Sequence, residues 1–267
     1  MKRTIKIIAL ILSLIGVIVL LSFVDRSSDH KEVHEVKIKI DSAGGNRFVT
    51  ENIIWQKIVS MGDSLKGIPF GEIDFPRIEK VLTNIPSVEN AEVFAYITGD
   101  VKIDVKQRHP IVRVHNNFGE RFYIDGNGRM MDLSDNYTAP VVIALGNINE
   151  HFVANRILDA SASDTIIEKS KLTQIYILAR FLEENPFWEA QTDQILVNSD
   201  GELELYPRVG GHTILLGDVS DLEEKFYRLM VFYKKGLSMV GWDKYRLINL
   251  KFRNQIVCTK TNNNGTI

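Results

Sequence analysis

Three short patterns in the sequence place reactive side chains at spacings that could support chemistry. The first, Gly62–Leu65, reads Gly-Asp-Ser-Leu, a motif whose serine is the nucleophile in one class of hydrolases. That chemistry also needs an aspartate and a histidine spaced Asp-x-x-His, because a base must accept the serine proton and must itself be oriented. None of the six histidines has an aspartate three residues before it. The favoured interpretation is therefore a turn that ends a helix.

The other two patterns suggest metal ligands. Asp125–Gly128 resembles the start of a calcium loop, but an EF-hand needs Asp or Asn and then Gly where this chain has Arg129 and Met130. His30 and His34 are spaced i, i+4 without a third ligand nearby. The sequence therefore predicts no catalytic residue, no metal site and no cofactor.

The composition narrows the function classes further. The 267 residues include 32 lysines and arginines and 34 aspartates and glutamates, which leaves a net charge of −2. Near neutrality gives no support for nucleic-acid binding, and no pattern suggests a small-molecule substrate. The length allows one large domain or two small ones. The single cysteine, Cys258, excludes an internal disulfide and is interpreted as a small buried hydrophobe.

The N-terminus combines a basic tail with a long apolar run. Residues 1–6 include Lys2, Arg3 and Lys6, whereas residues 7–24 carry no charge. At about 1.5 Å per residue this run spans roughly 27 Å as a helix, close to the hydrocarbon thickness of a bilayer. A transmembrane helix over 7–24 is predicted, with the tail in the cytoplasm and the rest of the chain outside it. A cleaved signal peptide is the alternative, but its apolar core is usually shorter.

Residues 32–110 are predicted to fold as a small α+β domain. Alternation over 33–40 indicates a strand, and Thr50 and Asp74 are natural starts for two helices. A hairpin should follow, because apolar and polar residues alternate over 101–106 after a glycine-containing turn. The predicted order is strand, helix, helix, strand, strand.

This order and several short segments resemble a POTRA domain, an interaction module whose sheet edges can accept a partner strand. One segment joins the second helix to the hairpin with the pattern Pro-x-Val-x-x-Ala-x-Val, and Pro86 ends the helix. Another ends the last strand at Pro110. The resemblance implies a βααββ fold and a docking role. The segments that carry it are Phe48–Ile54, Gly62–Leu65, Asp74–Val93 and Val105–Val112.

Residues 111–260 are predicted to form a second domain of mixed β structure with flanking helices, followed by a polar tail over 261–267. An apolar stripe predicts one continuous helix over 164–184. Ser220–Glu223 has the form of a capping box that opens a second helix, 221–235. Strands are expected at 121–125, 129–131, 141–146, 194–197, 202–206, 212–216, 245–252 and 256–260.

The succession of basic tail, transmembrane segment, POTRA domain and mixed β domain resembles the FtsQ/DivIB family of bacterial cell-division proteins. The resemblance implies a non-enzymatic bitopic scaffold of the divisome in the cytoplasmic (inner) membrane, with a periplasmic or extracytoplasmic bulk, expected at the septum. It also implies small coiled-coil membrane partners of the FtsB/FtsL kind. The more telling segments are Tyr123–Met130, Leu216–Gly217 ahead of the helix that carries Lys225 and Leu229, and Ile248–Phe252.

The terminal strand is the predicted partner site. In this interpretation it forms a sheet edge whose unpaired backbone groups accept a partner strand, with helix 221–235 beside it. An interior position is the alternative. The family more often shows Ile-Asp-Leu-Arg where this chain has Ile248–Lys251. The predicted partner-binding residues are Tyr245, Leu247, Ile248, Asn249, Leu250, Lys251 and Phe252.

Two other functions remain open from the sequence. A POTRA domain would equally suit a docking or chaperone module of an envelope assembly or transport system. A membrane-anchored hydrolase would need a convergent nucleophile and base, and the sequence offers no such set.

Overall fold

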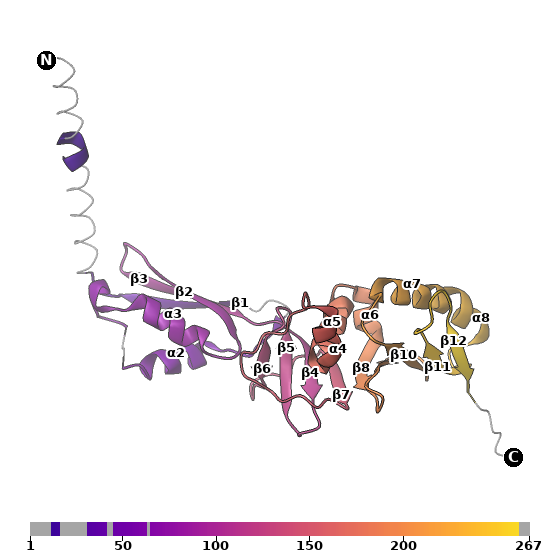
Figure 1. Ribbon diagram of the computed structural model, residues 1–267. Coiled ribbons are helices and arrows are strands. Elements are labelled where there is room, and N and C mark those ends of the chain that lie inside the picture. Colours follow the sequence, from indigo (N-terminus) through magenta and orange to yellow (C-terminus); the bar gives the residue numbers. More distant parts are fainter. Residues whose placement is uncertain (1–11, 17–30, 42–44, 63–64, 262–267) are drawn as a thin grey trace. The chain divides into compact units, whose positions relative to one another are not determined.

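The computed structural model of the chain describes residues 12–16, 31–41, 45–62 and 65–261. The chain separates into two compact units, residues 1–108 and 109–267. Each unit has its own sheet, of three strands in the first and nine in the second, with helices packed on it (Figure 1). The mixed α+β class predicted from the sequence is confirmed.

The predicted transmembrane segment falls mostly outside the described residues. Within 7–24 only residues 12–16 are described, and they are helical. Among the residues that the structure describes, no helix has the length and apolar character needed to cross a membrane. The segment 62–65, interpreted from the sequence as a turn that ends a helix, also lies partly outside them, because residues 63 and 64 are not described.

The first unit has its elements in the predicted order, with one additional 3₁₀ turn. Strand β3 is central, parallel to β1 and antiparallel to β2. The apolar residues of its inner face, Val101, Ile103 and Val105, are completely buried. The elements are β1 (Glu35–Asp41), α2 (Glu51–Val59), η2 (Phe70–Glu72), α3 (Phe75–Thr83), β2 (Val88–Ala95) and β3 (Asp100–Gln107).

The two helices of this unit begin at the predicted caps. The Thr50 hydroxyl accepts a hydrogen bond from the Ile53 amide at 3.4 Å, and an Asp74 carboxylate oxygen accepts one from the Arg77 amide at 3.0 Å. Each cap satisfies an amide that the helix itself leaves unpaired. The local sequence therefore determines where both helices start.

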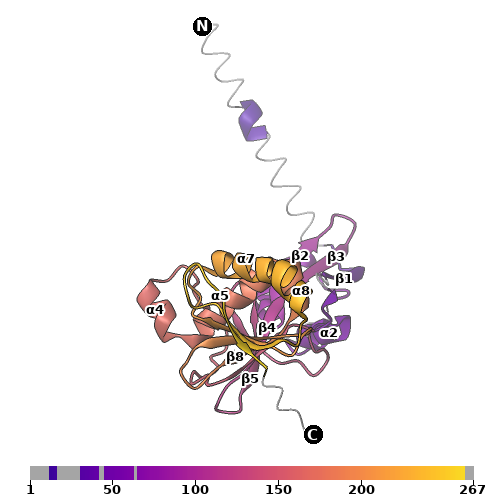
Figure 2. The ribbon, with the colours of Figure 1, turned by 90° about the vertical axis from the view of Figure 1, so that its right-hand side faces the viewer.

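The second unit is a long mixed sheet with helices on one side. Figure 2 shows α5 and α7 on the same side of the sheet. The strand order is β12-β11-β10-β9-β8-β7-β4-β5-β6. The elements are β4 (Pro110–His115), β5 (Arg121–Asp125), β6 (Met130–Asp132), β7 (Val142–Gly146), α4 (Asp164–Lys169), α5 (Lys171–Glu183), α6 (Pro186–Gln191), β8 (Thr192–Val197), β9 (Leu203–Pro207), β10 (Thr213–Gly217), α7 (Leu222–Phe232), the π-helical turn η3 (Tyr233–Leu237), α8 (Ser238–Val240), β11 (Tyr245–Asn249) and β12 (Val257–Lys260).

The helices of this unit occur where neighbouring strands are parallel. β7 pairs with β8 in parallel, and α4 to α6 connect them; β10 pairs with β11 in parallel, and α7 to α8 connect them. Parallel neighbours need a crossover because the chain must return to the same end of the sheet, and at these two pairs helices supply it. Leu172, Ile175 and Leu229 bury their side chains in the core beneath these crossovers.

The prediction of one continuous helix over 164–184 is wrong. The chain leaves helical geometry at Ser170, where φ is −105° and ψ is 111°, and α5 starts anew. The Ser170 hydroxyl accepts a hydrogen bond from the Thr173 amide at 3.1 Å. Glu150, distant in sequence, accepts one from the Leu172 amide at 3.0 Å. These two caps satisfy amides that a continuous helix would have satisfied itself.

The prediction of a capping box at Ser220–Glu223 is also wrong. Asp221 occupies the N-cap position in left-handed geometry, with φ at 49°, and its side chain makes no capping bond. Ser220 instead donates its hydroxyl to the Asp218 carboxylate. The turn predicted at Asp125 is confirmed, because its carboxylate accepts hydrogen bonds from the amides of Asn127 and Arg129 between β5 and β6.

One buried histidine makes the second unit sensitive to pH. His212 is 2 % exposed, and its Nε2 lies 2.8 Å from the Tyr233 hydroxyl. Its Nδ1 is buried without a hydrogen-bond partner in the described part of the chain. Burial lowers the pKa of His212 from its usual 6.5, and the smaller opposing effect of Asp243 does not reverse this. The imidazole is therefore held neutral in the folded state.

We expect the free energy of unfolding to decrease as the pH falls below 6.5. Above that pH the imidazole is neutral in both states; below it the unfolded chain takes up the proton first, until the lower folded-state pKa is reached. Uptake of one such proton lowers the free energy of unfolding by at most about 1.4 kcal/mol per pH unit.

Urea denaturation between pH 7.5 and 5 measures this dependence. His212→Phe should reduce the pH slope of the free energy of unfolding without abolishing it, because burial also lowers the pKa of His115. His151→Gln, at an exposed site, should leave the slope unchanged. Equal slopes for the parent chain and His212→Phe would contradict the assignment.

Candidate partner-binding edge

The nine-stranded sheet ends at β12, a strand of four residues. β12 pairs antiparallel with β11, whereas β11 lies between β12 and β10 and pairs with both. The predicted edge, Tyr245–Phe252, is therefore wrong in position: its first five residues form β11, the second strand of the sheet, and residues 250–252 follow that strand. The alternative of an interior strand holds for these residues.

The predicted partner-binding residues consequently have different environments. Ile248 and Leu250 are completely buried in the core. The Leu250 amide donates to the Leu215 carbonyl at 2.9 Å, which continues the pairing beyond the strand. Tyr245, Leu247 and Asn249 are half-buried, and Lys251 and Phe252 are exposed.

On the outer side of β12, no strand of the described residues pairs with its backbone groups. The Thr261 amide donates to the Lys244 carbonyl at 3.1 Å, so residue 261 faces β11. Backbone groups alternate in direction along a strand, which turns the amide and carbonyl of Cys258 and Lys260 away from β11. Cys258 itself is half-buried, and burial raises the pKa of its thiol.

An apolar groove of about 530 Å³ runs between α7 and the segment before β12. Tyr227 is 70 % exposed at this groove, and Val257 at the start of β12 is 43 % exposed. No lining residue is acidic, and Arg228 and Lys235 are basic. The groove is lined by Tyr227, Arg228, Val231, Phe232, Lys235, Gly236, Asn254, Gln255 and Ile256.

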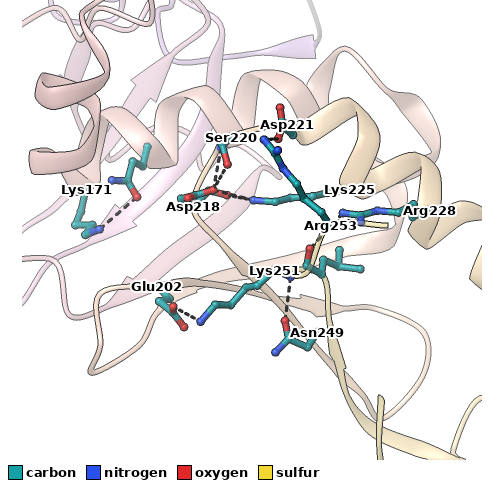
Figure 3. Close-up of polar contacts among 12 residues, drawn as sticks. Lys171, Glu202, Asp218, Ser220, Asp221, Lys225, Arg228, Asn249, Lys251 and Arg253 are labelled. Atoms are coloured by element: carbon teal, nitrogen blue, oxygen red, sulfur yellow. Dashed lines mark hydrogen bonds and ion pairs between the residues drawn. The ribbon is translucent and has the colours of Figure 1, made fainter. Parts of the chain in front are cut away.

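A second cleft, of about 460 Å³, lies at the N-terminal half of α7 and contains mixed charges (Figure 3). The buried Lys225 ammonium donates to the Asp218 carbonyl at 2.9 Å and to its carboxylate at 2.8 Å. Burial opposes ionisation of Asp218, but the hydrogen bonds from Lys225 and Ser220 outweigh it and lower the pKa of this carboxyl. Lys225 therefore fixes the turn that follows β10.

Lys251 also faces this cleft and forms an ion pair with Glu202 (Figure 3). Its amide donates to the Asn249 carboxamide oxygen at 2.9 Å. Gly217, with φ at 82°, lies so close that a Cβ atom there would be 2.9 Å from the Lys251 Cγ. A glycine is thus required at 217. The charge of Lys251 is paired with that of Glu202 within the unit.

The Arg228 guanidinium connects α7 to the chain between β11 and β12. It donates to the Phe252 carbonyl at 2.7 Å and to the Leu250 carbonyl at 3.3 Å. Its side chain is only 16 % exposed. The arginine therefore positions the segment that leads into β12. Sequence reasoning missed it, because its acceptors are backbone carbonyls with no sequence signature.

Neither a metal centre nor a nucleophile set is evident in the described ranges. Within them no three His, Cys, Asp or Glu residues converge on a point that could hold a metal ion. The geometry that is present, a free strand edge beside an apolar groove, suits binding of another polypeptide.

Comparison with known families identifies both units. The family model described as FtsQ/DivIB, C-terminal related, matches residues 109–259, which is more than half of the chain. The chain belongs to the FtsQ/DivIB family. A POTRA-like domain model matches residues 31–106 of this FtsQ/DivIB chain, as the sequence predicted. No curated protein matches it. Both are families of non-enzymatic scaffolds, which suggests a cell-division scaffold.

We expect Arg228→Met to loosen β12 while leaving the centre of the sheet intact. The substitution keeps the aliphatic volume but removes two charge-assisted hydrogen bonds, a loss of about 1–3 kcal/mol. Hydrogen exchange measured by mass spectrometry should accelerate over 250–260 more than over β9.

The matched control is Arg180→Met, which removes an exposed arginine that pairs with Glu184 on α5. It should change exchange in neither region. Equal protection of 250–260 in the parent chain and in Arg228→Met would show that the arginine does not hold this segment.

Proposed function

We propose that this FtsQ/DivIB protein is a bitopic membrane scaffold of the bacterial divisome without catalytic activity. Residues 7–24 anchor it in the inner membrane, with residues 1–6 in the cytoplasm and both folded units in the periplasm or extracytoplasmic space. The membership of residues 109–259 in the FtsQ/DivIB family supports the role in division. The charge pattern of the N-terminus supports the orientation.

The proposed mechanism is addition of a partner strand to β12, and its free outer edge is the observation that carries this proposal. Backbone hydrogen bonds to an edge strand supply affinity, and pockets beside the edge supply specificity. A short strand that ends in a lysine, as β12 does, is protected against indiscriminate pairing. The edge is therefore suited to a chosen partner.

The chemistry of the groove indicates the kind of partner. Its lining is mainly apolar and contains no acidic residue. Arg228 is bonded within the unit, so Lys235 is the lining cation that favours an acidic side chain in an otherwise apolar partner segment. Small coiled-coil membrane proteins of the FtsB/FtsL kind, with a strand-forming segment beyond the coil, would present such a surface. This partner choice replaces the predicted contact through Lys251, which is paired with Glu202.

The location of a fluorescent fusion in dividing cells tests the division role. A mid-cell ring during constriction is the expected result, together with filamentation on depletion of the protein. A uniform envelope signal with intact septation would contradict the proposal and would favour a docking module of an envelope assembly or transport system.

We expect Lys260→Pro to weaken binding of the FtsB/FtsL-type pair by about tenfold or more, which corresponds to about 1.4 kcal/mol. Proline removes the outward amide of Lys260 and leaves the bonds between β12 and β11 in place. The measurement is co-purification of the pair from membranes, followed by titration in detergent.

Lys260→Ala is the matched control, because it removes the same side chain and keeps the amide. It should bind nearly as the parent chain does. Thr259→Pro removes an inward amide and should instead destabilise β12 itself. Unchanged binding of Lys260→Pro, with an unchanged melting temperature, would exclude strand addition at this edge.

A further inference from the structure

The turn between β2 and β3 exposes large apolar side chains at the end of the POTRA-like unit. Ile97 is 78 % exposed, Tyr96 is 46 % exposed and Phe94 is 42 % exposed. Single exposed apolar residues are common on protein surfaces, but a group at one hairpin end marks a contact surface. These three residues are called the hairpin tip below.

The hairpin tip is held in a fixed conformation. The Tyr96 amide donates to the Asp100 carbonyl at 2.9 Å, and the Gly99 amide donates to the Tyr96 carbonyl at 3.0 Å. Gly99 has φ at 97°, and a Cβ atom there would lie 2.4 Å from the His34 ring. The apolar side chains are therefore presented by a rigid turn, which lowers the entropy cost of docking.

The tip lies beside the point where the described chain of this unit begins. The Lys31 ammonium donates to the Ile97 carbonyl, and the His34 amide donates to the Gly99 carbonyl at 2.8 Å. Figure 1 shows the β2–β3 turn at the same end of the unit as the start of this chain segment. The position of Lys31 therefore determines the position of the tip.

The length of chain before Lys31 places the tip near a membrane. The apolar run ends at Val24, seven residues earlier. Seven residues span at most about 25 Å when fully extended. If residues 7–24 cross the bilayer, the tip must lie within that reach of its outer surface.

The chemistry of the tip fits a lipid interface. Tyrosine is enriched at the membrane–water boundary, where its ring is buried and its hydroxyl stays hydrated. An aliphatic side chain such as Ile97 gains by leaving water for the acyl boundary. Lys31 can attract anionic headgroups. The one carboxylate in the turn, Asp100, accepts a hydrogen bond from the Thr98 hydroxyl at 3.2 Å.

We propose that the hairpin tip docks on the outer surface of the membrane, with Ile97 inserted among the lipids and Tyr96 at the headgroup level. This inference rests on the membrane anchor in the proposed function. It assigns the POTRA-like unit a second attachment, which restricts its rotation about the chain that leads from the anchor.

The test uses the full chain in vesicles of phosphatidylethanolamine and phosphatidylglycerol, without any partner protein. Cys258→Ser removes the single native cysteine, and Ile97→Cys then carries an environment-sensitive fluorophore. We expect a blue-shifted emission and quenching by lipid-borne quenchers at least about twofold stronger than at a control site in water.

The matched control is Asn84→Cys in the same background. Asn84 is exposed and follows α3, just before β2 begins. The eight residues of β2 separate it from the tip by about 25 Å. A second variant, Tyr96→Asp with the label at 97, should shift the label back toward water, since a charge at the headgroup boundary opposes insertion.

The outcomes separate the two proposals. If the fluorophores at 97 and 84 give the same emission and quenching while the chain resists alkaline extraction from the vesicles, the docking is wrong and the anchor is not. Extraction of the chain by alkali overturns the anchor and the docking together. Strong quenching by lipid-borne quenchers at residue 97, but not at residue 84, supports the docking.

Discussion

The C-terminal half of the sheet depends on two cations of α7 that bind groups at the ends of neighbouring strands. β10 and β11 are parallel, so their carboxyl ends lie side by side. Lys225 binds Asp218 just after β10, and Arg228 binds the carbonyls of Leu250 and Phe252 just after β11. Helix and strands are thereby fixed to one another by charge-assisted hydrogen bonds as well as by apolar packing.

This arrangement is costly in isolation. Lys225 lies in the first turn of α7, where a cation opposes the helix dipole, and its ammonium is largely removed from water. Direct hydrogen bonds to a carboxylate and to carbonyls offset both the unfavourable interaction with the helix dipole and the cost of removing the ammonium from water. The chain has one cysteine and so no internal disulfide, which leaves such contacts, apolar packing and sheet pairing to hold the unit together.

Local patterns predicted the first unit well, because its determinants are local. The caps at Thr50 and Asp74 and the alternation of Val101, Ile103 and Val105 act over a few residues. The break at Ser170 has one local signal, the hydroxyl that caps α5, but the apolar stripe runs through it and the second cap comes from Glu150, distant in sequence.

The same reasoning explains why the predicted edge strand was misplaced. Alternation predicted that Ile248 and Leu250 would pack on one face, and both are buried. It could not reveal that β10 and β12 occupy both sides of β11, because pairing partners are chosen by the whole sheet. The edge strand is instead β12. Its short length and its terminal lysine are the only features of the sequence that indicate an edge position.

If a partner strand adds to β12 as proposed, its binding depends on residues that need not touch the partner. A strand can add only to an edge that is itself ordered, because a mobile edge must first lose conformational entropy. Arg228 orders the segment before β12, and Lys225 orders the helix that carries Arg228. Affinity at the edge is therefore coupled to the stability of the β10–α7–β11 crossover, and substitutions there can weaken an interaction while the binding surface stays chemically intact.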